Sequence, residues 1–449
     1  MEISQTKTLF ISSFFGLIAR NILATDFLKV LAAKDDLRII IFAPQEKKYL
    51  YQETFSSSNV TVEGMPNREA SRFELWVDSI FLNASDTSAR RIHRLIERRR
   101  DGRYVRFIGY GLLAKLSIFA FSRKLLRWLA YKLPLSSGWG EYFEKYKPDL
   151  VFATDIFEPN DIFMIREAQR RSIFVLGMVR SWDNIVTKGL NRVITDKLVV
   201  NCPKIKEEAV KYCDFKPENI FVVGIPHYDD YIAETRISKE ELFQSLGLDP
   251  KKKTVFFCPP SDIYAQGDPI AEKVVKLLQS LNVQIILRLY LVGKISLGNV
   301  KAVPGRLAID DPGASSDFEQ VDLIGKDAHL ADLIYHSDVV IAFASTLAID
   351  AAVFGKPIIF VGFDGSNNCP YWQSLLRFYD YDHQKSLLDT GGVVLAKTPQ
   401  EFLWALDRYL VNPKLDVLGR ARIINERCWK LDGRSGWRLA RVVKRCLNR

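Results

Sequence analysis

One stretch of this chain limits its possible folds more than any other: an apolar run that ends in hydroxyl residues, a helical segment, and a second apolar run. Residues 337–365 read SDVVIAFASTLAIDAAVFGKPIIFVGFDG. The first run is rich in β-branched residues and predicts a buried strand, and Ser345 with Thr346 fits a helix start. A Gly-Lys-Pro sequence ends that helix, and PIIFVG predicts a second strand. The pattern predicts a βαβ unit whose helix N-terminus offers N–H donors to a phosphate.

Strand-like and helix-like segments alternate along the rest of the chain. Short apolar runs such as TLFISSF, LRIIIFAP, PDLVFATD, IFVLGMV, DKLVVN and IFVVG end near polar residues, with helix-like segments between several of them. This alternation predicts a mostly parallel sheet with helices on both faces. It restarts after Tyr228 with KTVFFCPP, VQIILRLY, DVVIAFA and KPIIFVG. We therefore predict an N-terminal α/β domain (1–225), a C-terminal α/β domain (226–418) and a last segment (419–449) that packs back toward the first domain.

Length and composition agree with a globular protein of two domains. The chain has 449 residues, which is long for a single core, with 48% hydrophobic and 26% charged residues. Its six cysteines are scattered without a CxxC pair, which argues against a zinc site or a disulfide framework and fits a reducing compartment. The histidines show no ligand spacing, so no metal site is predicted. Neither a dinucleotide-binding glycine motif nor a P-loop motif occurs, so those two nucleotide-binding classes have no support.

The net charge of +10 is concentrated in one segment. Between Arg90 and Lys132 there are thirteen Lys or Arg residues and two acids. Aromatic and aliphatic residues follow the arginine-rich part, and basic residues interrupt them, so the segment should not span a membrane. A basic and aromatic composition is typical of an interfacial helix on anionic lipid, and we predict that residues 90–136 lie on such a surface. Two alternatives stay open: ordinary core under a solvated basic helix, and nucleic acid, which is the least favoured partner.

Three segments of the chain carry a resemblance to a known group of enzymes. They are the linker beginning VVGIPHYD, the unit FASTLAIDAAVFGKPIIF, and the late block YLVNPKLDVLGRARIINERCWKLDGRSGWRLARVV. With these segments the chain resembles the GT-B glycosyltransferases over most of residues 145–445. Within that group it is most similar to the branch shared by CDP-glycerol glycerophosphotransferases and UDP-GlcNAc 2-epimerases. The resemblance implies an α/β fold of two Rossmann-like domains that face each other across a cleft, with a nucleotide-activated donor on the C-terminal domain.

By this resemblance, the donor diphosphate lies at the helix that starts near Ser345. Ser345 and Thr346 are expected to hold phosphate oxygens, and Asp350 to hold the ribose. Arg288 ends the strand VQIILRLY, where related proteins often place a basic residue toward the donor, and Ser261 follows the first strand of the domain. A guanidinium can bind phosphate with two hydrogen bonds and stabilise a departing diphosphate, so no metal or other cofactor is required. Alternatively, Arg288 is only a surface residue at a strand end.

Polar residues at two strand ends of the N-terminal domain are candidates for chemistry on the acceptor. The sequence MVRSWDNIVTKG follows the strand IFVLGMV and places Trp182, Asp183, Asn184 and Lys188 at its carboxyl end. Asp183 is the first candidate for the base that deprotonates an acceptor hydroxyl, and Trp182, Asn184 and Lys188 are candidates for acceptor binding. Asp155, after the strand PDLVFATD, is the second candidate base. The structural alternatives are an Asp-Asn turn anchored by a buried Trp, and helix capping by Asp155.

These features predict a peripheral transferase at the inner, cytoplasmic face of the cell membrane. It would move a sugar, or a glycerol phosphate-like unit, from a nucleotide-activated donor to a lipid-linked or surface-polysaccharide acceptor. The first alternative is a soluble UDP-sugar 2-epimerase, which the basic and apolar segment argues against. The second is a non-catalytic basic α/β module that binds nucleic acid or membrane. The phosphate-binding helix and the SWDN sequence argue against this module.

Overall fold

The computed structural model of the chain divides into two compact units. It describes residues 6–34, 36–66, 70–133, 138–233, 236–289, 295–312, 327–366 and 369–449. Of these residues, those up to Ala233 and those from Arg427 onward form unit 1, and those between 236 and 426 form unit 2. The sequence predicts boundaries at 225/226 and 418/419, and both observed boundaries fall later. The first does so because α12 (His227–Ala233) packs on the last helix of the chain, within unit 1.

Unit 1 is built on a parallel sheet that helices cover on both faces. Within the described residues the sheet has seven strands in the order β3-β2-β1-β4-β5-β6-β7. The order reverses between β1 and β4, as in a doubly wound fold. Because such a sheet is buried on both faces, its central strands are continuously apolar. The strands are β1 (Lys7–Ser12), β2 (Leu37–Pro44), β3 (Val60–Met65), β4 (Leu150–Ala153), β5 (Phe174–Met178), β6 (Lys197–Val200) and β7 (Ile220–Val222).

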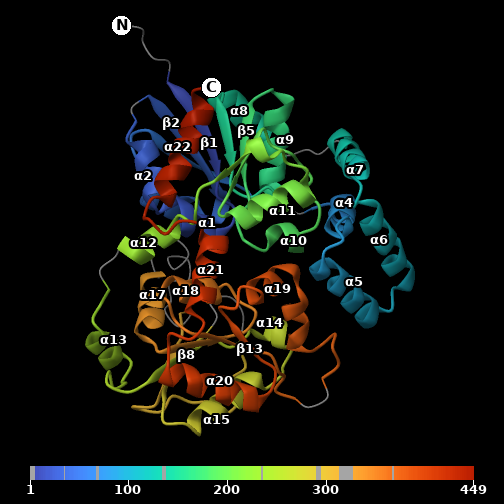
Figure 1. Cartoon of the computed structure of the whole chain (residues 1–449). Helices are drawn as coiled ribbons and strands as arrows, with labels where there is room; N and C mark the ends of the chain where they lie inside the picture. The colour runs from blue at the N-terminus through green and yellow to red at the C-terminus, as the bar shows by residue number, and fades with distance from the viewer. Residues whose placement is uncertain are drawn as a thin grey trace. The chain divides into compact units, whose positions relative to one another are not determined.

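Four of the helices of unit 1, α4 to α7, lie together at one side of the sheet (Figure 1). Ser71 begins α4 with a capping box to Glu74, and Thr87 begins α5 by accepting the N–H of Arg90. The helices described in unit 1, besides α12 and α22, are α1 (Gly16–Ile18), α2 (Asp26–Ala32), α3 (Lys48–Phe55), α4 (Arg72–Asn83), α5 (Ser88–Asp101), α6 (Tyr104–Leu116), α7 (Ala120–Lys132), α8 (Trp139–Tyr146), α9 (Pro159–Arg170), α10 (Asn184–Thr187) and α11 (Pro203–Cys213), with π-helical or 3-10 turns at Ala19–Leu23, Gln45–Lys47 and Pro217–Asn219.

The last helix of the chain belongs to the core of unit 1. Helix α22 (Ser435–Leu447) packs on α2, and Figure 1 shows it in red beside the blue α2. Its side chains Leu439 and Val443 are fully buried in the same apolar core as Leu9 of β1. The first strand and the last helix of the chain therefore stabilise one core.

Side chains from α3 and α8 hold a carboxylate on the edge strand β3. Glu63 accepts hydrogen bonds from Lys48 Nζ (3.2 Å), from Lys145 Nζ (2.8 Å) and from the hydroxyl of Tyr146. Burial raises the pKa of a carboxyl, but here the hydrogen bonds outweigh burial and lower the pKa of Glu63 to about 2.

We expect Glu63 to make part of the fold's stability dependent on acid pH. A glutamate ordinarily titrates at 4.5, so the contribution of Glu63 to stability is complete above that pH and is lost as the pH falls toward 2. Glu63→Gln should therefore be less stable than wild type near neutral pH, and the difference should shrink at about pH 3. Urea unfolding of both proteins at the two pH values measures this difference. A difference independent of pH would contradict the assignment.

Unit 2 repeats the doubly wound arrangement with a smaller sheet. Its described part has six parallel strands in the order β10-β9-β8-β11-β12-β13, which reverses between β8 and β11. The two parallel sheets confirm the predicted α/β class with two Rossmann-like domains. The strands are β8 (Thr254–Phe257), β9 (Gln284–Arg288), β10 (Leu307–Asp310), β11 (Val339–Ala342), β12 (Ile358–Val361) and β13 (Val394–Ala396). The helices described here are α13 (Lys239–Ser245), α14 (Asp262–Ala265), α15 (Ile270–Gln279), α17 (Asp327–His336), α18 (Leu347–Val353), α19 (Asp382–Leu388), α20 (Pro399–Val411) and α21 (Val417–Ile423), with a 3-10 turn at Leu375–Asp380 and a π-helical turn at Ile424–Cys428 that leads into unit 1.

Candidate functional site

The strand order marks one position at the edge of each sheet as the place for a ligand. In doubly wound sheets, ligands bind beyond the carboxyl ends of the strands, where the order reverses. This position lies between β8 and β11 in unit 2 and between β1 and β4 in unit 1. In unit 2 the N–H of Cys258, directly after β8, donates to the carbonyl of Ile341 in β11 (3.0 Å), so the two strand ends lie side by side.

Ser345 and Thr346 stand in the turn between β11 and α18. Thr346 directly precedes the helix, is exposed, and makes no capping hydrogen bond with its side chain. The Ser345 hydroxyl accepts the N–H of Leu347 at 3.2 Å. Asp350, one turn into the helix, is only 7% exposed. The two hydroxyls thus lie at the reversal of the strand order, whereas Asp350 lies on the buried side of α18.

Ser261 stands at the same edge, after the neighbouring strand β8. It precedes the short helix α14, and it is only 2% exposed. Within the described residues, its hydroxyl has no hydrogen-bond partner. Such a hydroxyl costs free energy, because it has lost its hydrogen bonds to water and gained none in the protein. Ser261 is therefore a buried polar group that an oxygen of a ligand can satisfy.

Arg288 ends β9 next to β8, but its guanidinium is already bound. It forms an ion pair with Asp310, its register partner on β10, and that carboxylate also lies 3.0 Å from His329 Nε2. Burial would raise the pKa of Asp310, but the hydrogen bond from His329 and the charge of Arg288 outweigh burial and lower it. Asp310 and His329 were missed by the sequence analysis, since the pairing depends on the register of two strands. The ion pair uses Nη1 of Arg288, so a direct contact with a diphosphate would use the other nitrogens of the guanidinium or replace Asp310.

Hydroxyl and carboxyl groups gather at the strand-order reversal of unit 1. The Ser12 hydroxyl, at the end of β1, accepts the N–H of Thr154 after β4 (2.9 Å) and donates to the carboxyl of Asp161 in α9. The N–H of Asp155 donates to the same carboxyl at 3.3 Å. Sequence analysis selected Asp155 but missed Ser12 and Asp161. The only signal for these two residues was a polar side chain close to a strand end.

Asp155 is buried between two cations. Its carboxylate lies 3.0 Å from Arg180 Nε and 3.2 Å from Lys188 Nζ, and it accepts the N–H of Phe157 at 3.0 Å. Asp155 is only 1% exposed, whereas 35% of the Lys188 side chain is exposed. A buried carboxylate that two cations already occupy is poorly placed to meet a substrate hydroxyl. The structure thus brings the candidates Asp155 and Lys188 together in one ion-pair cluster and adds Arg180.

Two neighbouring carboxyl groups favour the protonated form. Burial raises the pKa of Asp161 well above its usual range, and the charge of Glu158 adds to this effect. Burial also raises the pKa of Glu158, whose carboxyl accepts the N–H of Asp161 at 3.0 Å. Carboxyl groups with raised pKa values are typical of sites that exchange protons. The strand-order reversal of unit 1 therefore holds the buried Asp161 and the partly buried Glu158, two carboxyl groups with raised pKa values, beside Asp155.

Asp183 lies at the start of α10 and is partly exposed. Its carboxylate accepts hydrogen bonds from the hydroxyls of Ser181 and Thr187, and no cation pairs with it among the described residues. Hydrogen bonds from hydroxyls fix the direction of a carboxylate without neutralising its charge. Of the two candidate bases, Asp183 is therefore the one that is accessible and is not paired with a cation among the described residues.

Trp182 and Asn184, on either side of Asp183, are buried. Trp182 is 8% exposed, and its ring centroid lies 5.4 Å from the guanidinium carbon of Arg427. Asn184 is 2% exposed, and its side-chain nitrogen meets no acceptor within the described residues. The placement of Trp182 is that of an anchor for the turn. Asn184, like Ser261, leaves a buried polar group for a ligand.

Comparison with known proteins identifies relatives of the fold. No protein-family model and no curated protein sequence matches the chain. A UDP-GlcNAc 2-epimerase from Neisseria meningitidis, solved bound to UDP-GlcNAc, matches with a TM-score of 0.57 and 12% identity, covering 99% of this chain and 100% of that chain. The epimerase from Methanocaldococcus jannaschii gives a TM-score of 0.53 and 14% identity, covering 98% and 99%. A glycosyltransferase from Rickettsia africae gives 0.50 and 12%, covering 99% and 98%.

These similarities extend over both units of the chain. They show that the chain shares the fold of UDP-GlcNAc 2-epimerases and of a glycosyltransferase, which confirms the predicted fold and the resemblance to that branch. At such low identity the similarity establishes the fold and leaves the reaction to be argued from the residues.

Proposed function

We propose that this chain is a nucleotide-sugar enzyme of the GT-B fold that transfers a sugar, or a glycerol phosphate-like unit, from a nucleotide-activated donor to a lipid-linked or polysaccharide acceptor. The observation that carries the proposal is that polar groups gather where the strand order reverses in both sheets. A donor that carries a nucleotide is supported by the structural neighbour solved with UDP-GlcNAc.

In this proposal unit 2 binds the donor. The hydroxyls of Thr346 and Ser261 donate hydrogen bonds to phosphate oxygens, because one is exposed and the other has no partner among the described residues. Ser345 lies beside Thr346 in the same turn, and Asp350 holds the ribose. Hydrogen bonds to a charged phosphate are stronger than those between neutral groups, so a few hydroxyls contribute substantially to affinity.

In the same proposal unit 1 acts on the acceptor. For sugar transfer, the acceptor hydroxyl attacks the anomeric carbon, and the bond from that carbon to the nucleotide diphosphate breaks. The diphosphate leaves with the electron pair, and the hydroxyl proton passes to a carboxylate. Asp183 is the proposed base, since it is partly exposed and free of a cation in the described part of the chain. Lys188 and Asn184 contact the acceptor, and Trp182 supports the turn.

A UDP-sugar 2-epimerase is the second candidate, and two observations favour it. The epimerases among the structural neighbours cover almost all of this chain. Inversion of a C–H centre also needs groups that accept and donate a proton, and the raised pKa values of Asp161 and Glu158 suit that task.

One assay separates these functions. The protein is incubated with UDP-GlcNAc or with CDP-glycerol, with and without a lipid extract as acceptor, and the products are followed by NMR. A transferase releases free nucleotide only when the acceptor is present. An epimerase converts UDP-GlcNAc to the 2-epimer without any acceptor. If the protein neither binds nor converts these donors, both enzyme functions are excluded and a non-catalytic module is left.

We expect the hydroxyl residues of unit 2 to control donor affinity. Ser345→Ala/Thr346→Ala should weaken nucleotide binding about ten- to a hundred-fold, because a hydrogen bond to a charged group contributes ~1.5–3 kcal/mol. Ser261→Ala should also weaken binding, yet leave the unliganded protein equally stable or slightly more stable, since the hydroxyl has no partner within the described residues. Asp350→Ala tests the ribose contact in the same way.

Isothermal titration with UDP and UDP-GlcNAc measures these affinities. Ser280→Ala is the matched control, since Ser280 ends α15 just before β9 and so lies toward the amino ends of the strands. If the double variant and the Ser261 variant both bind as tightly as wild type, the donor does not bind at this edge of unit 2.

A further inference from the structure

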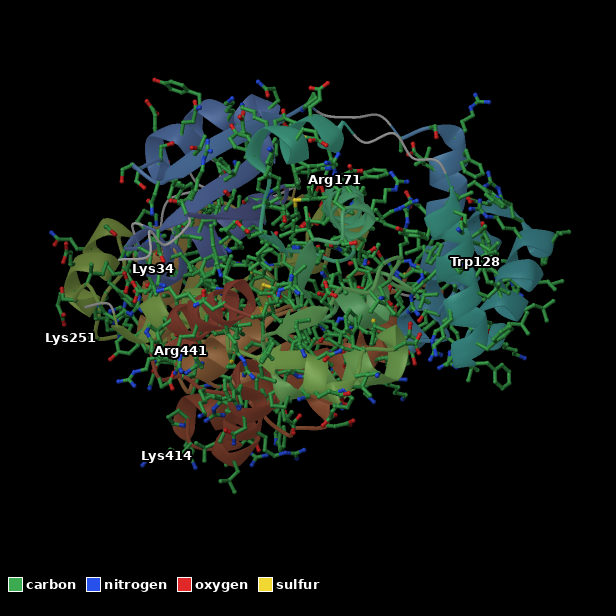
Figure 2. All side chains as sticks on the ribbon, turned by 90° about the horizontal axis from the view of Figure 1, so that it is seen from above. Lys34, Trp128, Arg171, Lys251, Lys414 and Arg441 are labelled. Carbon is green, nitrogen blue, oxygen red and sulfur yellow. The ribbon has the colours of Figure 1, made fainter. Side chains whose placement is uncertain are left out.

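Helices α6 and α7 and the residues between them expose large apolar side chains at a higher density than the rest of the described chain. Of the 31 exposed large apolar side chains in the described residues, twelve lie between Tyr104 and Tyr131. Val105 is 87% exposed, Phe121 76% and Phe119 67%. We call this the α6–α7 surface, which consists of Tyr104, Val105, Ile108, Leu112, Leu116, Ile118, Phe119, Phe121, Leu125, Trp128, Leu129 and Tyr131. Figure 2 shows Trp128 on the group of helices beside the sheet of unit 1. An apolar patch of this extent on a globular unit marks an interaction site.

The opposite face of α7 explains why these side chains point outward. Arg123 and Arg127 both bind the carboxylate of Asp214 at the end of α11, and Arg127 Nη2 also donates to the side chain of Asn191 (2.7 Å). Arg166 Nη2 donates to the carbonyl of Tyr131 at 2.9 Å. These contacts fix one face of α7 to unit 1. The apolar side chains on the other face are therefore held exposed by a fixed helix, and they do not come from a frayed segment.

The dimensions of the two helices exclude a simple membrane span. Each has 13 residues, which corresponds to about 20 Å of helix, against about 30 Å for the hydrocarbon core of a bilayer. Within the described residues, no single helix is both long enough and apolar enough to cross a membrane. Only α6 and α7 together reach that length and composition, and they are bent by 113° at the break between them. A bent pair of short helices with one exposed apolar face suits an interface and not a crossing.

The charged residues of α6 and α7 themselves are all basic, and the nearby carboxylates Asp101 and Asp214 are paired with arginines. From Gly102 to Lys132 the sequence has no Asp or Glu. Lys115 is exposed on the same helix face as Leu112, and Lys124 and Lys132 are exposed beside Phe121 and Trp128. Apolar side chains flanked by lysines match the acyl boundary and the phosphates of an anionic lipid layer.

The structure also divides the basic residues that the sequence shows as one cluster. Arg90, Arg94 and Arg127 are buried, and Arg94 and Arg127 bind carbonyl groups of unit 1. These three arginines therefore stabilise the fold of unit 1, which agrees with the alternative that part of the segment is ordinary core. Residues 134–136 of the predicted segment lie outside the described residues. The exposed lysines of α6 and α7, together with exposed arginines such as Arg99, Arg103 and Arg106, are available to a partner.

We propose that the α6–α7 surface docks this protein on an anionic lipid bilayer, with both helices lying in the headgroup layer. A second copy of the chain is disfavoured, because a two-fold contact would bring like charges together around the same patch. Nucleic acid is disfavoured, because seven of the twelve side chains of the surface are aliphatic and offer no ring on which a base can stack. The proposal does not depend on which reaction the enzyme carries out.

Vesicle co-sedimentation tests the proposal with the full chain. Wild type is expected to sediment with vesicles of equal parts phosphatidylcholine and phosphatidylglycerol, to release as salt rises, and to bind phosphatidylcholine vesicles much less. Phe119→Ser/Phe121→Ser should lower partitioning onto the mixed vesicles at least about tenfold, because both side chains lose the apolar environment. Lys124→Gln/Lys132→Gln should lower it about twenty- to thirty-fold.

Matched variants in unit 2 control for general effects of charge and surface polarity. Leu418→Ser removes a side chain that is 80% exposed, and Lys251→Gln/Lys414→Gln removes two exposed charges, and both should bind vesicles as wild type does. Circular dichroism checks that each variant is folded. Equal binding of wild type and the Phe119/Phe121 variant overturns the proposal. So does a wild-type dimer in sedimentation equilibrium that this variant abolishes without any vesicle binding. A wild type that shifts an RNA probe but ignores vesicles overturns it as well.

Discussion

Asp183→Asn is expected to lower turnover by about 10²–10⁴-fold while leaving donor affinity nearly unchanged. That range is typical for the removal of a general base. Asn keeps one oxygen that can accept the hydrogen bond from Ser181, and Thr187 also donates to the backbone carbonyl of residue 183, so the turn should stay intact. Donor affinity should be preserved because the proposed donor site belongs to the other unit. Steady-state release of nucleotide and isothermal titration, measured on the same preparation, test both statements.

Asp155→Asn is the informative comparison. It removes a buried charge between Arg180 and Lys188, so its main expected effect is lower stability. If Asp155→Asn is well folded and inactive while Asp183→Asn is active, the base is Asp155. If both variants turn over as wild type does, the SWDN turn is structural and the proposed chemistry of unit 1 is wrong.

Asp214→Ala is expected to lower the free energy of unfolding by about 3–5 kcal/mol. Its carboxylate is only 11% exposed and holds two guanidinium groups, those of Arg123 and Arg127. Removing one partner from a buried ion-pair network leaves the remaining charges without compensation, and this is what makes the loss large. The loss should concentrate in α7, which the two arginines attach to α11. Urea unfolding gives the total, and hydrogen exchange of α7 amides shows where the protection is lost.

Glu144→Ala is the control for this prediction. Glu144 pairs with Arg171, but its side chain is 70% exposed and solvent screens the pair, so its removal should change stability very little. If Asp214→Ala and Glu144→Ala lower the free energy of unfolding by the same amount, the buried network does not hold α7 in place.

The strands predicted from the sequence and those missed differ by their place in the sheets. Every central strand of both sheets was predicted, because a strand covered on both faces is a continuous apolar run. The missed strands, β3, β10 and β13, all lie at sheet edges. Edge strands are partly solvated, and VTVEGM, LAID and VLA are too mixed or too short to stand out in a sequence. The α/β class was therefore predictable, whereas the number of strands was not.

The residues of the candidate site also differ in whether the sequence predicts them. Ser261, Ser345 and Thr346 could be placed from sequence, because each directly follows a recognisable central strand. The partner of Arg288 could not, since Asp310 comes from the edge strand β10 and meets Arg288 only through strand register. Asp161 was not predicted, because its raised pKa comes from burial, and it is buried beside Ser12, which lies far away in the chain. The sequence predicts where a residue lies along a strand, but it does not predict which distant residue its side chain contacts.

The position of α22 has a consequence for how the protein is made. Unit 1 begins with β1, yet its core needs Leu439 and Val443 from α22, so it stays incomplete until α22 has left the ribosome. Domains usually fold in order from the N-terminus during synthesis. The described residues of unit 2 all lie between 236 and 426. Unit 2 can therefore fold while one face of the sheet of unit 1 is still uncovered. Throughout translation that face is a binding site for chaperones, and a premature stop near residue 426 leaves it exposed to proteases.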